Sequence, residues 1–302
     1  MSLHRLSEFE GLAGLKVVRD SAFAVTGKLS TPLDDLCVPL RSENYLGEVN
    51  GSDRVAAVIT TVALSEGVDP RLGLAIAADP DAAHSEVHAQ CAKLRDKELR
   101  AIPNRIDSSA DIDPGAHIAP YGVEIGPRCY IGPGAVVRPG TAIEHDSIIH
   151  SGTSIGGPGF NTGFIGGRRR IVPQLGGVRV GPFVELLSNC CVARSLFGGN
   201  TVIGEETVAD NLVYIAHDVQ IGRRVQICAL VNVLGRTVVG DSAYLGPSAV
   251  IRNGLEIGAG AKVSMGAVVT ENVEPGATVT GNFAISHERF LARLRTIRKE
   301  DP

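Results

Sequence analysis

The side chain best placed for chemistry is His217, which lies midway along the chain between two glycines. Gly199 precedes it and Gly235 follows it by the same number of positions. An imidazole titrates near neutral pH and accepts a proton from an attacking amine or hydroxyl. A backbone N–H that no side chain covers can hold the oxyanion of a tetrahedral intermediate. If the fold stacks these residues on top of one another, they suit acyl transfer, with His217 as general base and Gly235 as oxyanion donor. The alternative is a surface histidine beside two turn glycines.

This equal spacing has its basis in a six-residue repeat that covers residues 203–274. No helix or plain strand has this period, since a helical face recurs at 3.6 residues and a strand alternates at two. Period six is typical of a parallel β-helix, in which three short strands, one from each hexad, form one coil. Each glycine is three hexads from His217, which is one coil. We expect the repeated aliphatic side chains to point inward and the glycines after them to turn the corners. Twelve positions share the register: Ile203, Ala209, Ile215, Ile221, Ile227, Val233, Val239, Leu245, Ile251, Ile257, Val263 and Val269.

The same register begins earlier and is interrupted twice. Its first members are Ile106, Ile112, Ile118 and, after a one-residue slip, Ile125, Ile131, Val137, Ile143, Ile149 and Ile155. Residues 156–177 then break it with a glycine-rich stretch that contains three consecutive arginines, 168–170. The register resumes at Val180, Leu186 and Val192 and skips again around residues 195–200. Because a long insertion in a repeat usually serves a site, we predict an excursion loop over residues 156–177.

The two ends of the chain do not follow the six-residue repeat. Residues 1–100 contain β-rich runs and a helix that should begin at Asp79 and Pro80, an acceptor cap followed by proline, and run to Lys97. This predicts a small α/β domain. Residues 286–299 predict a basic amphipathic helix capped by Ser286, with one apolar face made by Phe290, Leu291, Leu294 and Ile297. The predicted order is therefore an α/β domain over residues 1–100, a β-helix over residues 101–282 and a short helix over residues 283–302.

Composition narrows the class of protein. Aromatic residues make up 4% of the 302 residues, tryptophan is absent and there are 36 glycines, which suits a β-helix filled with aliphatic layers. The net charge of −4 gives no indication of a nucleic-acid partner. The first residues lack the apolar core of a signal peptide, and no run is long enough for stable membrane insertion, which predicts a cytoplasmic protein. Six cysteines without a CxxC pair are expected to be reduced.

Four segments resemble the UDP-3-O-(3-hydroxyacyl)glucosamine N-acyltransferases of lipid A biosynthesis, namely residues 210–222, 149–152, 159–160 and 173–176. The similarity extends over nearly the whole chain and includes an N-terminal domain that binds uridine in that family. It implies a homotrimer of left-handed parallel β-helices with active sites between subunits. The hand is implied by the resemblance only, since it contradicts the usual right-handed crossover. The family's general base falls on His217, and its oxyanion glycine falls on Gly235.

The resemblance also suggests residues that read the substrates. We expect Tyr45 to stack on the nucleotide base and Phe160 either to line an acyl channel or to anchor the loop. The further candidates for substrate binding are Ser42, His150, Gln174 and Asn211. Other family positions differ here: Pro158 replaces an acid, Ala193 an aspartate, Gly254 a second histidine and Ala267 a methionine of the acyl groove. The residues around Ser42 that flank uracil also differ. Acyl transfer is therefore expected to survive, while the amino sugar and the acyl chain stay open.

The sequence predicts an N-acyltransferase that moves an acyl group from a thioester, on the phosphopantetheine of an acyl carrier protein or on CoA, to the amine of a nucleotide-linked amino sugar. No further cofactor is expected. The alternatives are an acetyl-type, CoA-dependent sugar acyltransferase and a β-helix scaffold without turnover. A metal site formed by His117, His145 and His150 is a rival hypothesis, but no tight ligand spacing supports it. We do not expect Asp218 to orient His217, because neighbouring residues of a strand point to opposite faces.

Overall fold

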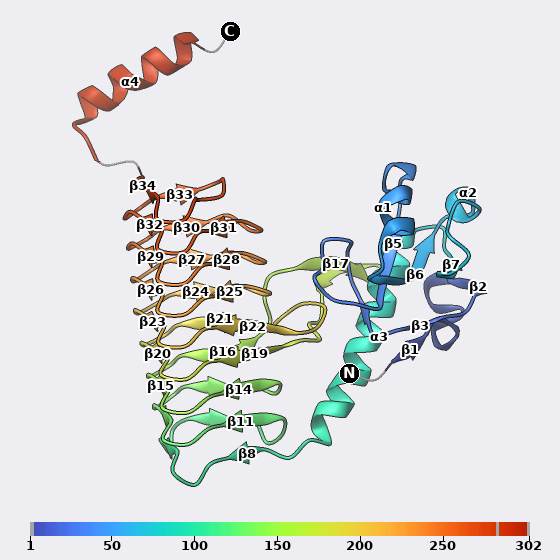
Figure 1. Cartoon of the computed structure of the whole chain (residues 1–302), viewed down its shortest axis with the longest axis horizontal. Helices are drawn as coiled ribbons and strands as arrows, with labels where there is room; N and C mark the ends of the chain where they lie inside the picture. Colours follow the sequence, from blue (N-terminus) through green and yellow to red (C-terminus); the bar gives the residue numbers. More distant parts are fainter. Residues whose placement is uncertain (1–2, 282–283, 301–302) are drawn as a thin grey trace.

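The chain folds into an N-terminal α/β region, a long stack of three-sided coils and a C-terminal helix (Figure 1). The computed structural model describes residues 3–281 and 284–300, without the side chains of residue 294 and of residues 297–300. The predicted fold class, a mostly β protein built on a parallel β-helix, is confirmed. The hand of the coil and the division into domains stay predictions.

The N-terminal region is a five-stranded sheet with helix α3 packed on it. The sheet has the order β2-β7-β6-β5-β4, and β2 is its antiparallel strand. Asp79 caps α3 as predicted, since its carboxylate accepts from the N–H groups of Asp81 and Ala82, both at 3.1 Å. The elements are β1 His4–Arg5, β2 Lys16–Arg19, β3 Ala22–Phe23, β4 Val25–Thr26, β5 Leu36–Leu40, η3 Glu43–Tyr45, α1 Leu46–Gly51, β6 Val55–Thr60, α2 Val62–Ser65, β7 Gly73–Ile76 and α3 Pro80–Arg100.

The coils form three parallel sheets, one on each side of the prism. One side contains β8 Arg105–Ile106, β11 Val123–Ile125, β14 Thr141–Ile143, β19 Gly177–Val180, β22 Asn200–Ile203, β25 Gln220–Ile221, β28 Val238–Val239 and β31 Glu256–Ile257. The second contains β9 Asp111–Ile112, β12 Tyr130–Ile131, β15 Ile148–Ile149, β20 Glu185–Leu186, β23 Val208–Ala209, β26 Gln226–Ile227, β29 Tyr244–Leu245, β32 Lys262–Val263 and β34 Thr278–Val279. The third contains β10 His117–Ile118, β13 Val136–Val137, β16 Ser154–Gly157, β21 Cys191–Ala193, β24 Tyr214–Ile215, β27 Asn232–Val233, β30 Val250–Ile251 and β33 Val268–Val269.

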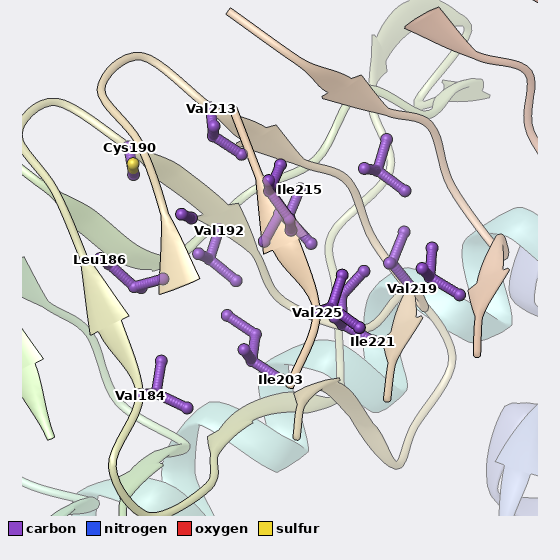
Figure 2. Packing of buried hydrophobic residues seen from close by; sticks show 14 of the residues in the cluster. Val184, Leu186, Cys190, Val192, Ile203, Val213, Ile215, Val219, Ile221 and Val225 are labelled. Atoms are coloured by element: carbon purple, nitrogen blue, oxygen red, sulfur yellow. The ribbon is translucent and has the colours of Figure 1, made fainter. Parts of the chain in front are cut away.

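The interior of the prism is filled by the repeated aliphatic residues. All twelve positions between Ile203 and Val269 are at most 6% exposed, and Figure 2 shows part of this packing. The first coil differs, because Ile106 is 42% exposed and Ile112 and Ile118 are only partly buried. No coil lies beneath them to cover their side chains. The hexad pattern therefore predicts the inward direction, and a neighbouring coil supplies the burial.

The corners do not turn in the way the sequence suggested. From Ile203 to Val263, the residue three places after each register position takes the left-handed conformation even where it is not glycine, as at Leu212 and Asp218, with φ of 63° and 62°. Glycines directly after the register position serve another purpose. A Cβ at Gly222 would lie 2.7 Å from the Asp241 nitrogen, and one at Gly240 would lie 2.5 Å from the Ala259 nitrogen. These glycines allow successive coils to approach closely.

Two excursions leave the stack on the side that faces the N-terminal region. Ile143 pairs with Val180, and Val180 pairs with Ile203. Both separations along the chain are longer than the three hexads that part paired residues such as Ile203 and Ile221. The first excursion contains an antiparallel hairpin, β17 Thr162–Ile165 and β18 Arg168–Ile171, which contacts α3. The predicted insertion over residues 156–177 is therefore present and is partly an ordered hairpin. Figure 1 shows β17 reaching toward α3.

The C-terminal helix α4 spans His287–Glu300, and the Ser286 hydroxyl accepts from the Arg289 N–H at 3.4 Å, as predicted for its cap. Phe290 is 53% exposed on it. The side chains of Leu294 and Ile297, predicted for the same face, lie outside the described residues. All six cysteines are free thiols, as expected. In the part of the chain that the structure describes, no helix has the length and apolar character needed to cross a bilayer.

Candidate active site

His217 and Asp218 form a hydrogen-bonded pair at one corner of the coil. The Nδ1–H of His217 donates to Oδ2 of Asp218 at 2.7 Å, so the unprotonated Nε2 is free to accept a proton. The expectation that Asp218 would not orient the ring was wrong. Its left-handed φ of 62° removes it from the alternation of an extended strand and turns its carboxylate toward the neighbouring imidazole. The His217 side chain is 12% exposed and that of Asp218 is 22% exposed.

The Asp218 carboxylate is itself held by the second excursion. Its other oxygen, Oδ1, accepts from the Leu196 N–H at 3.0 Å and from the Ser195 hydroxyl, whose single proton is shared with the Gly198 carbonyl. Its backbone N–H donates to the Thr201 hydroxyl at 3.0 Å. With one oxygen engaged by two donors, the second oxygen is directed at His217. This arrangement selects the tautomer in which Nδ1 carries the proton, and it can stabilise the imidazolium that forms when Nε2 becomes protonated.

Gly235 lies directly against the reactive edge of His217. A Cβ on Gly235 would lie 2.8 Å from both Cε1 and Nε2 of the imidazole. Among the described residues, no protein acceptor takes the Gly235 N–H. The stacking predicted from the three-hexad spacing is thus present on this side. A backbone N–H that has no protein acceptor, on a residue in contact with the imidazole, is a candidate oxyanion donor.

The prediction that Gly199 stacks below His217 was wrong. The strands β21 and β24 pair Val192 with Ile215, so the second excursion lies between His217 and the coil below it. Gly199 belongs to that excursion and does not contact the ring, since a Cβ on Gly199 would approach only Leu33 within 4 Å. The first excursion supplies the glycine instead. A Cβ on Gly159 would lie 3.1 Å from Cδ2 of His217 and 3.2 Å from its Cβ.

A cavity of about 350 Å³ opens beside His217 and Gly235. Phe160 and Asn161 of the first excursion and Phe197 of the second form part of its wall. Lys28 and Arg236 also line it, and among the described residues of this lining none is acidic. The remaining lining residues are Leu196, Tyr214, Ala216, Leu234 and Asn253. The space around the histidine is therefore partly aromatic and carries positive charge.

A second cavity, of about 320 Å³, continues the first toward the N-terminal region. The two share Lys28, Asn161, Leu196 and Phe197 in their walls. The second cavity reaches Pro39 at β5, and Phe164 and Arg169 of the hairpin also line it. From the start of α3 and the residue before it, the lining includes Asp79, Asp81, His84 and His88. The Arg169 guanidinium lies 4.9 Å from the centre of the Phe164 ring. Together the cavities form a route from His217 to the N-terminal sheet.

Only some of the residues predicted to bind substrate are gathered here. Phe160 is 79% exposed and lines the first cavity, and Gln174 lies next to Gly159, from which its Oε1 accepts at 3.0 Å. Gln174 Nε2 is buried and has no hydrogen-bond partner among the described residues. These two positions lie where the sequence interpretation requires them, although nothing in the geometry tests their role.

The other predicted residues lie elsewhere. Tyr45 is 54% exposed in η3, and Ser42 caps that helix by accepting from the Asn44 N–H at 3.3 Å; neither lines the two cavities. His150 bonds to Glu185 through Nε2 at 2.8 Å on another side of the prism. Asn211 Oδ1 accepts from the Ser188 N–H at 3.1 Å. Their proposed roles in substrate binding gain no support from this arrangement within the chain.

Several residues of the site were missed by the sequence analysis. Ser195, Lys28 and Asn253 carry no motif that marks them before the fold is known, whereas Gly159 belongs to one of the four segments that carry the resemblance. For Arg236 a signal existed, because it follows Asp218 by three hexads and is therefore at the same corner one coil higher. The changed family positions are dispersed: Gly254 turns a corner with φ of 73° beside Asn253, whereas Ala193 and Ala267 are buried.

The rival hypothesis of a metal site gains no geometric support. His145 bonds to Asp146 at 2.7 Å and His150 bonds to Glu185 at 2.8 Å, on different parts of the coil. Among the described residues there is no group of three or more His, Cys, Asp or Glu side chains arranged to hold a metal ion.

Comparison with known proteins supports the repeat and the resemblance. Residues 122–157 match the family model described as bacterial transferase hexapeptide (six repeats), and residues 236–271 match the hexapeptide repeat of succinyl-transferase. The chain is 41% identical over 155 residues to the UDP-3-O-acylglucosamine N-acyltransferase of Caulobacter sp. (strain K31), covering 50% of this chain and 45% of that one. It is 44% identical over 165 residues to the same enzyme of Caulobacter vibrioides (strain NA1000 / CB15N), covering 54% and 48%.

The chain thus spans about half the length of the curated relatives it matches. The resemblance found in the sequence is confirmed over that half, not over nearly the whole chain as the motifs suggested. Among solved structures, the UDP-N-acetylglucosamine acyltransferase from Campylobacter jejuni is 18% identical with a TM-score of 0.49, covering 64% of this chain and 83% of that one. A likeness at this level carries no argument about activity.

Proposed function

We propose that this chain is an N-acyltransferase that moves an acyl group from a thioester to the amine of a nucleotide-linked amino sugar. The observation that carries the proposal is the His217–Asp218 pair, whose Nε2 lies against Gly235 beside a cavity; among the described residues the Gly235 N–H has no acceptor. The name shared by the curated relatives, UDP-3-O-acylglucosamine N-acyltransferase, points to the same chemistry.

In the proposed reaction His217 acts twice. Its Nε2 takes a proton from the amine as the nitrogen attacks the thioester carbonyl, and Asp218 stabilises the resulting imidazolium. The carbonyl oxygen becomes an oxyanion, which accepts a hydrogen bond from the Gly235 N–H. When the intermediate collapses, the C–S bond breaks and the imidazolium returns its proton to the departing sulfur. The products are an amide and a free thiol, and His217 ends in its starting state.

The shape of the two cavities supports an acceptor that is extended, and the positive charge of the first cavity supports one that is anionic near His217, whereas Asp79 and Asp81 also line the second cavity. A nucleotide-linked sugar has its reactive amine several ångströms from its diphosphate and base. The continuous route from His217 to the N-terminal sheet matches such a molecule, and Lys28 and Arg236 near His217 would attract phosphate. We place the phosphates near these two cations. Stacking of the base on Tyr45 remains a prediction, since that ring lies outside both cavities.

The donor and the assembly are also proposals. Acyl carrier proteins are acidic, and Arg289, Arg293 and Arg295 are exposed on α4, where complementary charge would speed encounter at low salt. The side chains of Arg298 and Lys299, which belong to the same basic run, lie outside the described residues. We further propose a homotrimer, consistent with outward-facing apolar side chains such as Val208, Leu230 and Tyr244 on the coils.

The test is an assay of the purified chain with UDP-linked amino sugars and with acyl chains on acyl carrier protein or on CoA, followed by mass spectrometry. We expect amide product from at least one donor. Product only from acetyl-CoA would favour the small-acyl alternative. The absence of product from every donor, with intact folded protein, would leave the scaffold hypothesis in place and reject this proposal.

A further inference from the structure

His88, on the buried side of α3, makes hydrogen bonds through both ring nitrogens. Its Nε2 lies 2.6 Å from the carbonyl oxygen of Pro173, to which it must donate. Its Nδ1 is therefore unprotonated and accepts from the Thr26 hydroxyl at 2.5 Å. The residue is only 1% exposed, and this burial lowers the pKa of His88 to about 4, which keeps the ring neutral as this pair of bonds requires. The histidine thus joins β4 of the N-terminal region to the end of the first excursion.

The residues after Pro173 face two ways. Leu175 is 2% exposed and packs in the core of the N-terminal region with Phe9 and Val87. Gln174, between Pro173 and Leu175, points away from that core and accepts from the Gly159 N–H, and Gly159 lies against the His217 ring. One short stretch therefore anchors itself in the N-terminal region and supports the glycine beneath the proposed base.

The same stretch holds the second excursion, which holds Asp218. The Leu175 N–H donates to the Leu196 carbonyl at 2.9 Å, and the Gly176 N–H donates to the Ser195 carbonyl at 3.1 Å. Ser195 and Leu196 are the two residues that bind Asp218 Oδ1. The Arg194 guanidinium closes this junction by donating to the Gly176 carbonyl at 2.6 Å. Residues 173–176 thus reach His217 through Gly159 and Asp218 through Ser195 and Leu196.

We propose that His88 is a positioning residue for the His217–Asp218 pair, acting through residues 173–176. It contacts neither His217 nor Asp218, although it lines the second cavity and its ring lies edge-on to Phe197 at 5.4 Å. Its donor to Pro173 sets where this stretch lies, and the stretch sets the position of both members of the pair. The proposal rests on the proposed function for its kinetic consequence, whereas its structural part is independent of it.

A matched pair of substitutions separates the two bonds of the ring. The amide of glutamine reaches the level of Nε2, so His88→Gln retains a donor for the Pro173 carbonyl. The amide of asparagine reaches only the level of Nδ1, so His88→Asn keeps a partner for Thr26 and leaves the Pro173 carbonyl unpaired in a buried place. Thr60→Val is the control, because Thr60 is fully buried, donates to the Leu40 carbonyl at 2.8 Å within the N-terminal sheet and lines neither of the two cavities.

Two quantities are measured on the full chain. The first is kcat and KM with the donor found active. The second is hydrogen exchange of the backbone amides of Gly159, Leu175 and Gly176, which needs no substrate. We expect His88→Asn to lower kcat roughly 10- to 100-fold, since small misplacements of reacting groups have effects of this size. KM should change much less, and exchange at the three amides should become faster. His88→Gln and Thr60→Val should stay within a few-fold of the wild type in both measurements.

Each outcome decides the proposal. Unchanged kcat and unchanged exchange in His88→Asn would overturn it. Equal losses in His88→Asn and Thr60→Val would also overturn it, because they would mean a general weakening of the N-terminal region. If the wild type itself shows no turnover, the proposed function fails, while exchange in the Asn and Gln variants still decides whether His88 holds this stretch. Should His88→Asn not fold, Thr26→Val, which removes the hydroxyl that selects the His88 tautomer, is expected to give the same pattern with a smaller effect.

Discussion

The corners at His217 and at His145 have the same local geometry and different surroundings. In both, the histidine Nδ1 lies 2.7 Å from Oδ2 of the following aspartate, which has a left-handed φ of 62° at Asp218 and 57° at Asp146. At His145, however, the Phe183 ring lies edge-on at 5.2 Å, and Asp146 is also bound by Arg128 at 2.6 Å. At His217 a glycine faces the ring and two excursions surround it. His145 also lines a cavity, of about 530 Å³. The pair is thus a property of the coil corner, and the contact with Gly235 and the two excursions distinguish the candidate site.

The strongest test of this comparison removes each imidazole. His217→Ala should lower turnover by roughly 10²–10⁴-fold, the usual loss with a general base, while the melting temperature changes little. His145→Ala is the matched control and should leave kcat unchanged, because its ring packs edge-on against Phe183 and lines neither of the two cavities beside His217. Near wild-type activity in His217→Ala would disprove the assignment of His217 as the general base.

Replacing the two aspartates asks whether the orientation of the ring matters. In Asp218→Asn the donors Ser195 and Leu196 should retain the amide oxygen, which directs the NH₂ group at His217 Nδ1. The ring must then carry its proton on Nε2 and cannot act as a base. We expect kcat to fall on the order of 10²-fold or more. Asp146→Asn should have no effect on turnover. Equal kcat in both variants would show that Asp218 does not select the tautomer.

Gly235→Ala tests the opening above His217. The added Cβ would lie 2.8 Å from Nε2 and Cε1, so the ring must shift. We expect a loss of roughly 10-fold or more in kcat from misplacement of the base, with the N–H itself retained. Gly47→Ala is a suitable control, since a Cβ there meets nothing within 4 Å. Full activity of Gly235→Ala would mean that the contact is not maintained in solution.

As the pH is lowered, the segments that surround His217 should lose stability before those that surround His145. Burial, followed by the charge of His88, lowers the pKa of His84 to about 3, and burial lowers that of His88 to about 4. The unfolded chain binds these protons below about pH 6.5 and the folded chain does not, so stability falls as pH decreases from 6.5 toward 4. The Arg128 guanidinium holds the pKa of Asp146 at about 2, so its ion pairs persist in that range.

Hydrogen exchange between about pH 7 and pH 4.5, corrected for the intrinsic rate, would measure the acid effect. Protection at Leu175 and Gly176 should decrease relative to the amides of β14 and β15, which flank His145. In His84→Gln the side chain is a neutral amide that does not titrate. The stability of the N-terminal region should therefore depend less on pH in this variant. A uniform loss of protection along the chain would contradict this prediction.

The sequence by itself determined the coils, their inward-facing residues and the stacking of Gly235 on His217. These features follow from local periodicity, because each hexad pairs with the third hexad after it wherever nothing is inserted. Only the tertiary structure decided what lies beneath and around His217. The insertions lengthen the chain between paired strands, as between Ile143 and Val180 and between Val180 and Ile203, which removes Gly199 from the ladder and brings Gly159 and Ser195 to the site. The carboxylate of Asp218 faces the ring because of a left-handed corner, a backbone choice that the type of residue does not reveal.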